Sequence, residues 1–363
     1  MKNASEAAIL KTFLKAQDRL VYQTADLSLG SLSGMATARP GKKSAPIDLD
    51  PDFQRRERWN VQKQSALIES FLLNVPVPAI YLAESAAGQY SVVDGKQRIT
   101  AIHTFMSNGL RLKGLESFTD LEGLCFNELP EELRNALEIR PYVRVVTLLK
   151  QSDPSLKFEV FTRLNKGGEA MLPQELRKVA YRGALSDAIF ELSKQPVLRK
   201  QLKINGKNSP PYIRMEDAEY VLRFFTLNET WNTFSGSLRD ELDKFMEVNQ
   251  QLHGVELKKL ESRFLRALSG CDEIWGDHAF QRHTGAGWRS QFLAGMYDAE
   301  MLAVNLLTNA QLKLAREKRT KIVQATAKLF QKKEFEQSVR QGTNTPSFVR
   351  NRVNAVYELL ANA

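Results

Sequence analysis

The sequence predicts an α+β protein in which a mixed α/β part is followed by an all-helical part. Short apolar runs bounded by glycine and proline predict strands in the first half, and these strand signals fade beyond Gly183. After that point apolar residues recur at the 3.6-residue period of helices. The predicted divisions are 1–50 for an N-terminal helix and flexible segment, 51–183 for the mixed domain and 184–363 for the helical domain.

Composition is that of an ordinary globular protein, since 43% of the 363 residues are apolar and 26% are charged. The two cysteines, Cys125 and Cys271, lie far apart and lack metal-type spacing, which favours buried thiols in a reducing compartment. No apolar run is long enough to span a bilayer. We therefore expect a soluble cytoplasmic protein with no membrane partner.

The net charge of +9 is unevenly distributed, because residues 301–363 hold 11 Lys or Arg against 4 acids. A basic segment of this kind suits a polyanion such as DNA. A solvated helix face that keeps the protein soluble explains the same charges equally well.

The first part of the chain alternates helical and extended patterns. Residues 1–20 predict an amphipathic helix, and residues 30–51, rich in Gly, Ser, Ala and Pro, predict a loop. Asn60 is placed to cap a helix that prolines 76 and 78 end. Strands are expected at 79–83, 90–93 and 142–149, and further helices at 99–106, 133–139, 157–164 and from Pro173. In the second part, helices are expected at 185–193, 216–227, 238–248, 256–269, 290–307 and 309–332.

The most informative segment joins a strand to a helix through Asp94, Gly95, Lys96, Gln97 and Arg98. A helix N-terminus attracts anions, glycine lets a phosphate approach the backbone, and Lys96 and Arg98 add positive charge. Asp94 could hold Mg²⁺ or orient a water. An exposed tight turn is the alternative, but three charged groups with a glycine and a glutamine in five residues favour a binding site. The glycine spacing is not that of a Walker sequence.

Two further clusters contain candidate residues. Residues 52–60 combine arginines with aromatics; there we favour ligand contacts for Gln54 and Arg55 and inward packing for Phe53 and Trp59. Residues 161–169 end a helix in glycines, which are usual helix caps, although Arg163 and Asn165 could face a ligand. The four histidines show no metal-ligand spacing, and neither cysteine has a neighbouring histidine to activate it.

Six segments together resemble the N-terminal domain family of GmrSD-type modification-dependent restriction endonucleases, itself similar to the ParB/sulfiredoxin superfamily. They are Pro51–Arg55, Leu67–Ser70, Pro76–Tyr81, Val93–Arg98, Phe161–Asn165 and Leu172–Arg177, in the family's order and spacing. The family signature is Asp-Gly-Gln-Gln-Arg, and here Lys96 replaces the first glutamine. An added cation should favour phosphate.

The resemblance implies a ParB/sulfiredoxin-like nucleotide-binding domain that binds, and in some members hydrolyses, nucleoside triphosphates with Mg²⁺. The catalytic residues it implies are Asp94, Gln97 and Arg98, with Asp94 and Asn165 at the metal. The nucleotide-binding residues it implies are Gln54, Arg55, Gly95, Lys96, Thr100, Arg163 and Asn165.

The resemblance also implies DNA, modified or not, as a partner. Because no His-Asn-His nuclease pattern follows residue 184, we expect a sensor or regulatory component that works with a separate nuclease or other defence protein. Self-association stays open. Two other readings also stay open: a metal-dependent nuclease using Asp94, Glu69 and Glu175, and a non-enzymatic module that binds DNA or a protein.

Overall fold

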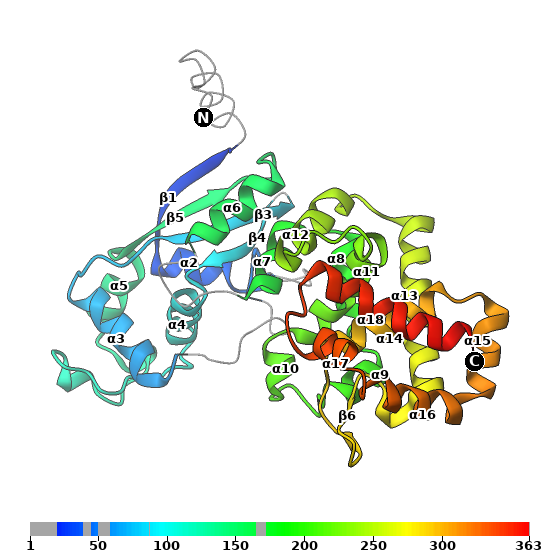
Figure 1. Cartoon of the computed structure of the whole chain (residues 1–363). Helices are drawn as coiled ribbons and strands as arrows, with labels where there is room; N and C mark the ends of the chain where they lie inside the picture. Colours follow the sequence, from blue (N-terminus) through cyan, green and yellow to red (C-terminus); the bar gives the residue numbers. More distant parts are fainter. Residues whose placement is uncertain (1–19, 39–44, 50–58, 87, 165–171, 363) are drawn as a thin grey trace, which may run out of the picture. The chain divides into compact units, whose positions relative to one another are not determined.

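The computed structural model describes residues 20–38, 45–49, 59–86, 88–164 and 172–362. The chain divides into two compact units, Met1–Ala180 and Tyr181–Ala363 (Figure 1). The first unit contains a five-stranded sheet and the second is built almost wholly of helices. The predicted α+β class is therefore confirmed. The predicted helix over residues 1–20 lies, up to residue 19, outside the described residues.

The sheet of the first unit has the strand order β1-β5-β3-β4-β2. Its strands are β1 (Tyr22–Ser28), β2 (Ile47–Asp48), β3 (Ile80–Ala86), β4 (Gln89–Asp94) and β5 (Tyr142–Leu148). The pairs β1–β5 and β3–β4 are antiparallel, whereas β3–β5 and β2–β4 are parallel. The three strands expected from the sequence are confirmed, and the two at the sheet edges were not foreseen.

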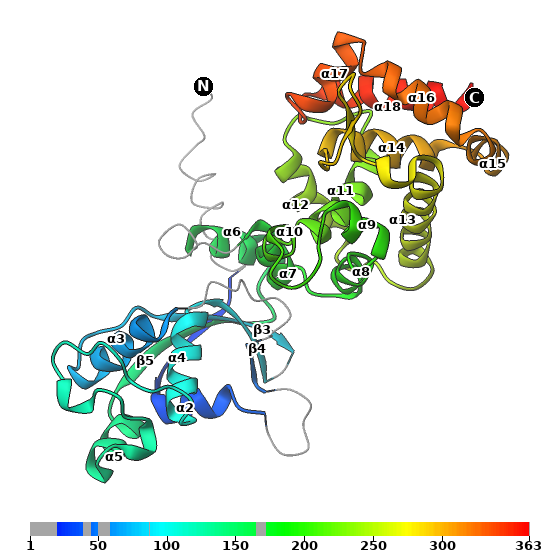
Figure 2. The ribbon, with the colours of Figure 1, turned by 90° about the horizontal axis from the view of Figure 1, so that it is seen from below.

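The first unit has six described α-helices, and the first four of them form one core with the central strands (Figure 2). They are α2 (Leu29–Met35), α3 (Val61–Leu72), α4 (Lys96–Met106), α5 (Glu131–Ile139), α6 (Pro154–Leu164) and α7 (Pro173–Ala180). Alternate strand residues Ile80, Leu82, Val92, Val143 and Val145 enter one core with apolar side chains of α2 to α5. This alternation is the period of a strand that buries one face. On strand positions outside that core, Ala83 and Val93 are also buried, so the centre of the sheet is covered on both faces.

The loop predicted over residues 30–51 is wrong for its first part, which forms helix α2. The Ser28 side chain accepts a hydrogen bond from the Ser31 amide and caps this helix. Leu29 and Leu32, one turn apart, are fully buried beneath the sheet. Tertiary packing of these two leucines outweighs the low helix propensity of the glycines and serines around them.

The helix predicted after Asn60 is confirmed with its cap, because the Asn60 side chain accepts a hydrogen bond from the Lys63 amide at 2.9 Å. Helix α4 begins at Lys96, three residues before the predicted start. The predicted passage from a strand directly into a helix is confirmed, because Lys96, Gln97 and Arg98 form the first turn of α4 after Gly95.

Among its described residues the second unit contains one short 3-10 helix, Gly276–His278, and eleven α-helices. They are α8 (Ala184–Leu192), α9 (Pro196–Gln201), α10 (Pro210–Ile213), α11 (Glu216–Thr230), α12 (Leu238–Asn249), α13 (Gly254–Trp275), α14 (Ala294–Leu306), α15 (Asn309–Glu317), α16 (Arg319–Leu329), α17 (Lys333–Arg340) and α18 (Pro346–Ala361). The predicted helix over 309–332 is divided at Lys318 into α15 and α16. No helix in the described part of the chain is long and apolar enough to cross a bilayer.

The helical unit also contains a short antiparallel ribbon that the all-helical prediction missed. Its strands are β6 (Arg282–His283) and β7 (Trp288–Arg289). The predicted helix over 290–307 accordingly begins later, at Ala294. Strands of two residues carry no detectable alternation in the sequence.

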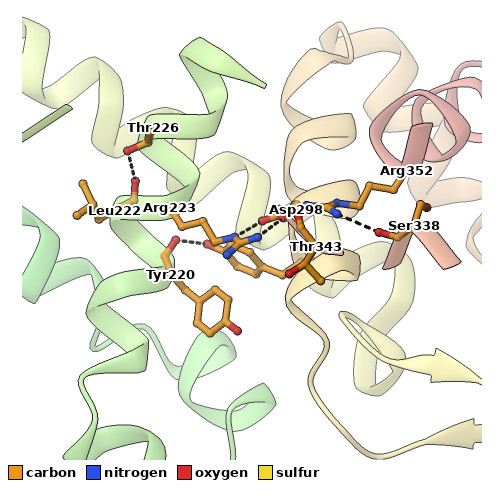
Figure 3. A network of polar contacts seen from close by, with 9 residues as sticks. Tyr220, Leu222, Arg223, Thr226, Asp298, Ser338, Thr343 and Arg352 are labelled. Atoms are coloured by element: carbon orange, nitrogen blue, oxygen red, sulfur yellow. Dashed lines mark hydrogen bonds and ion pairs between the residues drawn. The ribbon is translucent and has the colours of Figure 1, made fainter. Parts of the chain in front are cut away.

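A buried ion network ties together three helices of the second unit (Figure 3). The Asp298 carboxylate on α14 accepts two hydrogen bonds of 2.6 Å from Arg223 on α11 and one of 2.5 Å from Arg352 on α18. Arg352 also donates to the backbone carbonyls of Ser338 and Thr343. Burial alone would lower the pKa of Arg223, but the Asp298 charge raises it above its usual value. Arg223 therefore stays charged inside the core, whereas burial lowers the pKa of Arg352 in spite of the nearby Asp298 charge.

Glu69 on α3 gives the first unit a pH-dependent contribution to stability. Its buried carboxylate accepts hydrogen bonds from the backbone amides of Glu116, Ser117 and Phe118. Burial opposes ionisation, but these three bonds hold the pKa of Glu69 below its usual value of 4.5.

We expect this contribution to be complete above about pH 4.5, the pKa in the unfolded chain, and to be lost as the pH falls through the lower folded pKa. Glu69→Gln should lower the free energy of unfolding at neutral pH by about 1–3 kcal/mol, since a neutral amide is a weaker acceptor. Urea unfolding of both proteins over a pH series measures this. If the stability of the variant fell with decreasing pH as steeply as that of the wild type, the role assigned to the Glu69 carboxylate would be contradicted.

Candidate functional site

The candidate site lies where β4 passes into α4. Gly95 separates the two elements and adopts a left-handed conformation with φ of +93°. A Cβ atom at this position would lie 2.8 Å from Ile80 Cγ1. Both the backbone angle and the close approach of β3 therefore require glycine here. Since glycine has no side chain, it makes no side-chain cap on the first turn of α4.

Asp94 and Arg98 brace this junction. One Asp94 carboxylate oxygen accepts the Gly95 amide at 2.7 Å and the other accepts Arg98 Nη2 at 3.0 Å. Arg98 also donates through Nη1 to the Pro78 carbonyl at 2.8 Å. The Arg98 side chain is 11% exposed and that of Asp94 is 45% exposed. Arg98 therefore fixes the turn from inside, while Asp94 presents its carboxylate to solvent.

Gln97 and the chain before α3 meet at the same corner. The Gln97 side-chain oxygen accepts a hydrogen bond from the Trp59 amide at 3.3 Å. Trp59 packs against the core of the first unit, as its predicted inward orientation requires. Gln54 and Arg55, predicted to contact the nucleotide, lie outside the described residues.

Lys96 and Thr100 are both half-buried on α4. They are four residues apart, so they project from the same side of the helix. The site geometry therefore places a lysine ammonium group, a threonine hydroxyl and the Asp94–Gly95 turn at the N-terminal end of one helix.

Among the described residues of the third predicted cluster, Arg163 forms its ion pair within its own helix and not with this corner. Arg163, near the C-terminal end of α6, forms an ion pair with Glu159 on its own helix at 2.5 Å, and its side chain is 74% exposed. Asn165 lies outside the described residues, as does the rest of that glycine-rich segment. The predicted roles of Arg163 and Asn165 stay predictions.

Glu69 and Glu175, two of the carboxylates in the nuclease hypothesis, accept backbone hydrogen bonds in other parts of the fold. Glu69 accepts three backbone amides, and Glu175 accepts the Leu172 amide at 2.6 Å at the start of α7. Within the ranges that the structure describes, no three His, Cys, Asp or Glu side chains gather as metal ligands would. The sequence did not reveal these roles, because hydrogen bonds to backbone amides do not depend on residue type. Both carboxylates therefore looked available as metal ligands.

Two contacts at the site were not foreseen from the sequence, namely those of the Pro78 carbonyl and the Trp59 amide. Both are backbone groups, and nearly every residue type carries such groups. The residue types at positions 78 and 59 therefore do not indicate these contacts. The Pro76–Tyr81 and Asp94–Arg98 segments, separate in the sequence, are joined by the Arg98 guanidinium.

Comparison with known protein families identifies this region. Residues 41–182 match the family model described as the GmrSD restriction endonuclease, N-terminal domain. The segment is therefore similar to a GmrSD N-terminal domain. No curated protein and no solved structure matches the chain. The GmrSD match encloses the sheet strands β2 to β5 and the whole Asp94–Arg98 turn. The likeness to ParB and sulfiredoxin stays a prediction.

Proposed function

We propose that this chain is the nucleotide-binding regulatory component of a restriction or antiviral defence system that acts on DNA. A nucleoside triphosphate is the substrate at the Asp94–Arg98 turn, and Mg²⁺ assists its hydrolysis. Nucleotide turnover changes how the chain engages DNA or a separate nuclease. The observation that carries this proposal is the braced strand-to-helix junction, which lies in a segment that matches a restriction-endonuclease family model.

The chemistry of the junction fits a phosphate group. Helix α4 directs the positive end of its dipole at this corner, and Lys96 adds a cation there. The Arg98 bonds to Asp94 and Pro78 hold the turn in one geometry before any ligand arrives. Such preorganisation is the main contribution a protein makes to phosphoryl transfer.

Mg²⁺ fits the half-exposed Asp94 carboxylate, an oxygen ligand of the kind this ion prefers. When bound, the ion neutralises phosphate charge. Both Asp94 oxygens already accept hydrogen bonds, so Asp94 would act as a ligand while still held by Gly95 and Arg98. Gln97 is positioned by the Trp59 amide and would orient a water at the phosphate.

The test is phosphate release from each of the four common ribonucleoside triphosphates with Mg²⁺, with and without DNA. We expect Asp94→Ala to reduce release at least about tenfold, because one charge-positioning contact is typically worth that much or more. Asp26→Ala is the matched control, since Asp26 is also a half-exposed aspartate paired with an arginine, Arg144, but on the β1–β5 edge.

The possible results separate the competing functions. Nucleotide binding without hydrolysis, weakened by Asp94→Ala, would indicate a nucleotide-gated binding module. Plasmid nicking that needs only a metal ion would favour a nuclease. If the protein binds none of the four nucleotides and releases phosphate from none of them, the proposal is refuted.

A further inference from the structure

The β6–β7 ribbon projects from the helical unit beside α17 (Figure 1). Its tip is closed by the Thr284 amide and hydroxyl, which both donate to the Gly287 carbonyl. The tip residues Thr284, Gly285 and Ala286 are small and exposed. At the base, Arg289 is exposed and its side chain makes no ion pair with any described residue. The ribbon therefore offers a narrow tip and one unneutralised cation to solvent.

The ribbon is held firmly from within. The Trp288 ring stacks on His278 with centroids 5.0 Å apart and meets the edge of Phe330 at 6.3 Å. Arg282 forms an ion pair with Glu336 on α17 at 2.7 Å. These contacts fix the ribbon against the corner between α16 and α17. Ribbon and corner therefore form one surface.

That corner belongs to the most basic stretch of the chain. Residues 318–333 contain six lysines or arginines and no acid. Lys321 and Lys328 lie two turns apart on one exposed face of α16, and Lys332 is exposed in the short connection between α16 and α17. None of these three lysines forms an ion pair among the described residues.

The structure refines the basic C-terminal region seen in the sequence. Arg352 is fully buried, while Arg316 and Arg340 are paired with Glu273 and Glu336. Each of these three cations therefore already has an acidic partner. Of the eight other cations in residues 301–363, six lie within residues 318–333. The Trp288–Phe330 contact ties the strand that carries Arg289 to the end of this stretch.

We propose that the ribbon and the exposed face of residues 318–333 together bind the phosphate backbone of duplex DNA. This inference rests on the DNA-directed role proposed above, but not on nucleotide hydrolysis. Unpaired lysines on one helix face match the repeated negative charge of a duplex. A two-stranded ribbon with a tip of small residues is narrow enough to enter a DNA groove, as ribbons do in other DNA-binding proteins.

The test measures the affinity of the full chain for a short fluorescent duplex by anisotropy over a series of salt concentrations. The variant Lys328→Gln/Lys332→Gln removes two cations from the surface. The control Lys258→Gln/Lys259→Gln removes two exposed lysines from the start of α13. Trp275, at the other end of α13, donates a hydrogen bond to the Thr326 hydroxyl of α16. The control lysines therefore lie about 25 Å along α13 from this contact with α16.

We expect the Lys328/Lys332 variant to bind the duplex about tenfold more weakly and to lose about two units of the salt slope. The control variant should bind like the wild type. Arg289→Gln should weaken binding as well, with a smaller loss of slope. Nucleotide binding should be unchanged in all three variants, so a failed DNA surface is distinguished from a failed nucleotide site.

Equal losses in the Lys328/Lys332 and Lys258/Lys259 variants would show diffuse attraction and overturn the proposal. Unchanged affinity in the Lys328/Lys332 variant would overturn it too. Tighter binding of single-stranded RNA than of the duplex, lost in the same variant, would overturn duplex DNA as the occupant.

Discussion

Replacing Asp298 with asparagine is expected to lower the free energy of unfolding of the helical unit by about 3–5 kcal/mol. The Asp298 carboxylate bonds both Arg223 and Arg352 in the core. The side chain of Asp298 is 1% exposed, that of Arg223 is 7% exposed and that of Arg352 is 0% exposed. Without the Asp298 carboxylate, two guanidinium groups stay charged away from water and without a counter-charge. Leaving a buried charge unpaired costs far more than losing an exposed ion pair.

Urea unfolding followed by tryptophan fluorescence measures this loss. Three of the four tryptophans, Trp231, Trp275 and Trp288, lie in the helical unit and report on it. Asp277→Asn is the matched control, because Asp277 pairs with Lys200 on the surface with 77% of its side chain exposed. That control should unfold at nearly the same urea concentration as the wild type.

A further variant separates the ion network from packing. Replacing Asp298, Arg223 and Arg352 together with leucine and methionine of similar volume should restore most of the stability that Asp298→Asn removes. A triple variant that is less stable than Asp298→Asn would show that the network is needed as a set of directional bonds. A small effect of Asp298→Asn itself would contradict the assignment of two buried arginine charges.

The second large effect is expected at the candidate site. Gly95→Ala should lower the free energy of unfolding of the first unit by about 2–4 kcal/mol and impair nucleotide binding. Part of the cost, about 1–2 kcal/mol, comes from holding a residue with a side chain at φ of +93°. The rest comes from the new Cβ, 2.8 Å from Ile80 Cγ1 and 3.2 Å from Arg98 Nη2.

Gly88→Ala isolates the steric part of this effect. Gly88 also has a left-handed backbone, with φ of +73°, but a Cβ there meets nothing within 4 Å. Gly88→Ala should therefore show the backbone cost alone and leave nucleotide binding intact. Thermal unfolding and nucleotide titration of both variants provide the comparison. Equal losses of stability in the two variants would show that Ile80 and Arg98 move aside freely.

A shift of Arg98 would have its own signature. The Cβ that Gly95→Ala adds would press on the Arg98 guanidinium, which bonds to Asp94 and Pro78. Nucleotide affinity in Gly95→Ala should therefore fall even under conditions where the variant is fully folded. Normal affinity in the folded variant would mean that the braced turn does not bind nucleotide.

Local patterns determined much of the first unit. The Asn60 cap, the proline-terminated helix after it and the three central strands follow from short-range rules of capping, ring geometry and alternation. The candidate junction at Asp94–Gly95 was visible for the same reason. The backbone angle at this position requires glycine, and a glycine is visible in the sequence.

Other features were decided only by tertiary structure. Helix α2 forms in a Gly- and Ser-rich segment because Leu29 and Leu32 find a core to enter. Arg352 was counted among surface charges, yet it is buried, because its partner Asp298 lies 54 residues earlier in the chain. No local pattern records a contact over that separation.

The same distinction holds at the site and at the basic surface. The sequence determined that Arg98 stands beside Asp94 and that residues 318–333 are basic. Only the fold decided that Arg98 braces the turn, and that Trp288 packs against Phe330 at the end of α16. Charge is a property of a residue type, whereas its availability depends on which distant groups packing brings within hydrogen-bonding reach.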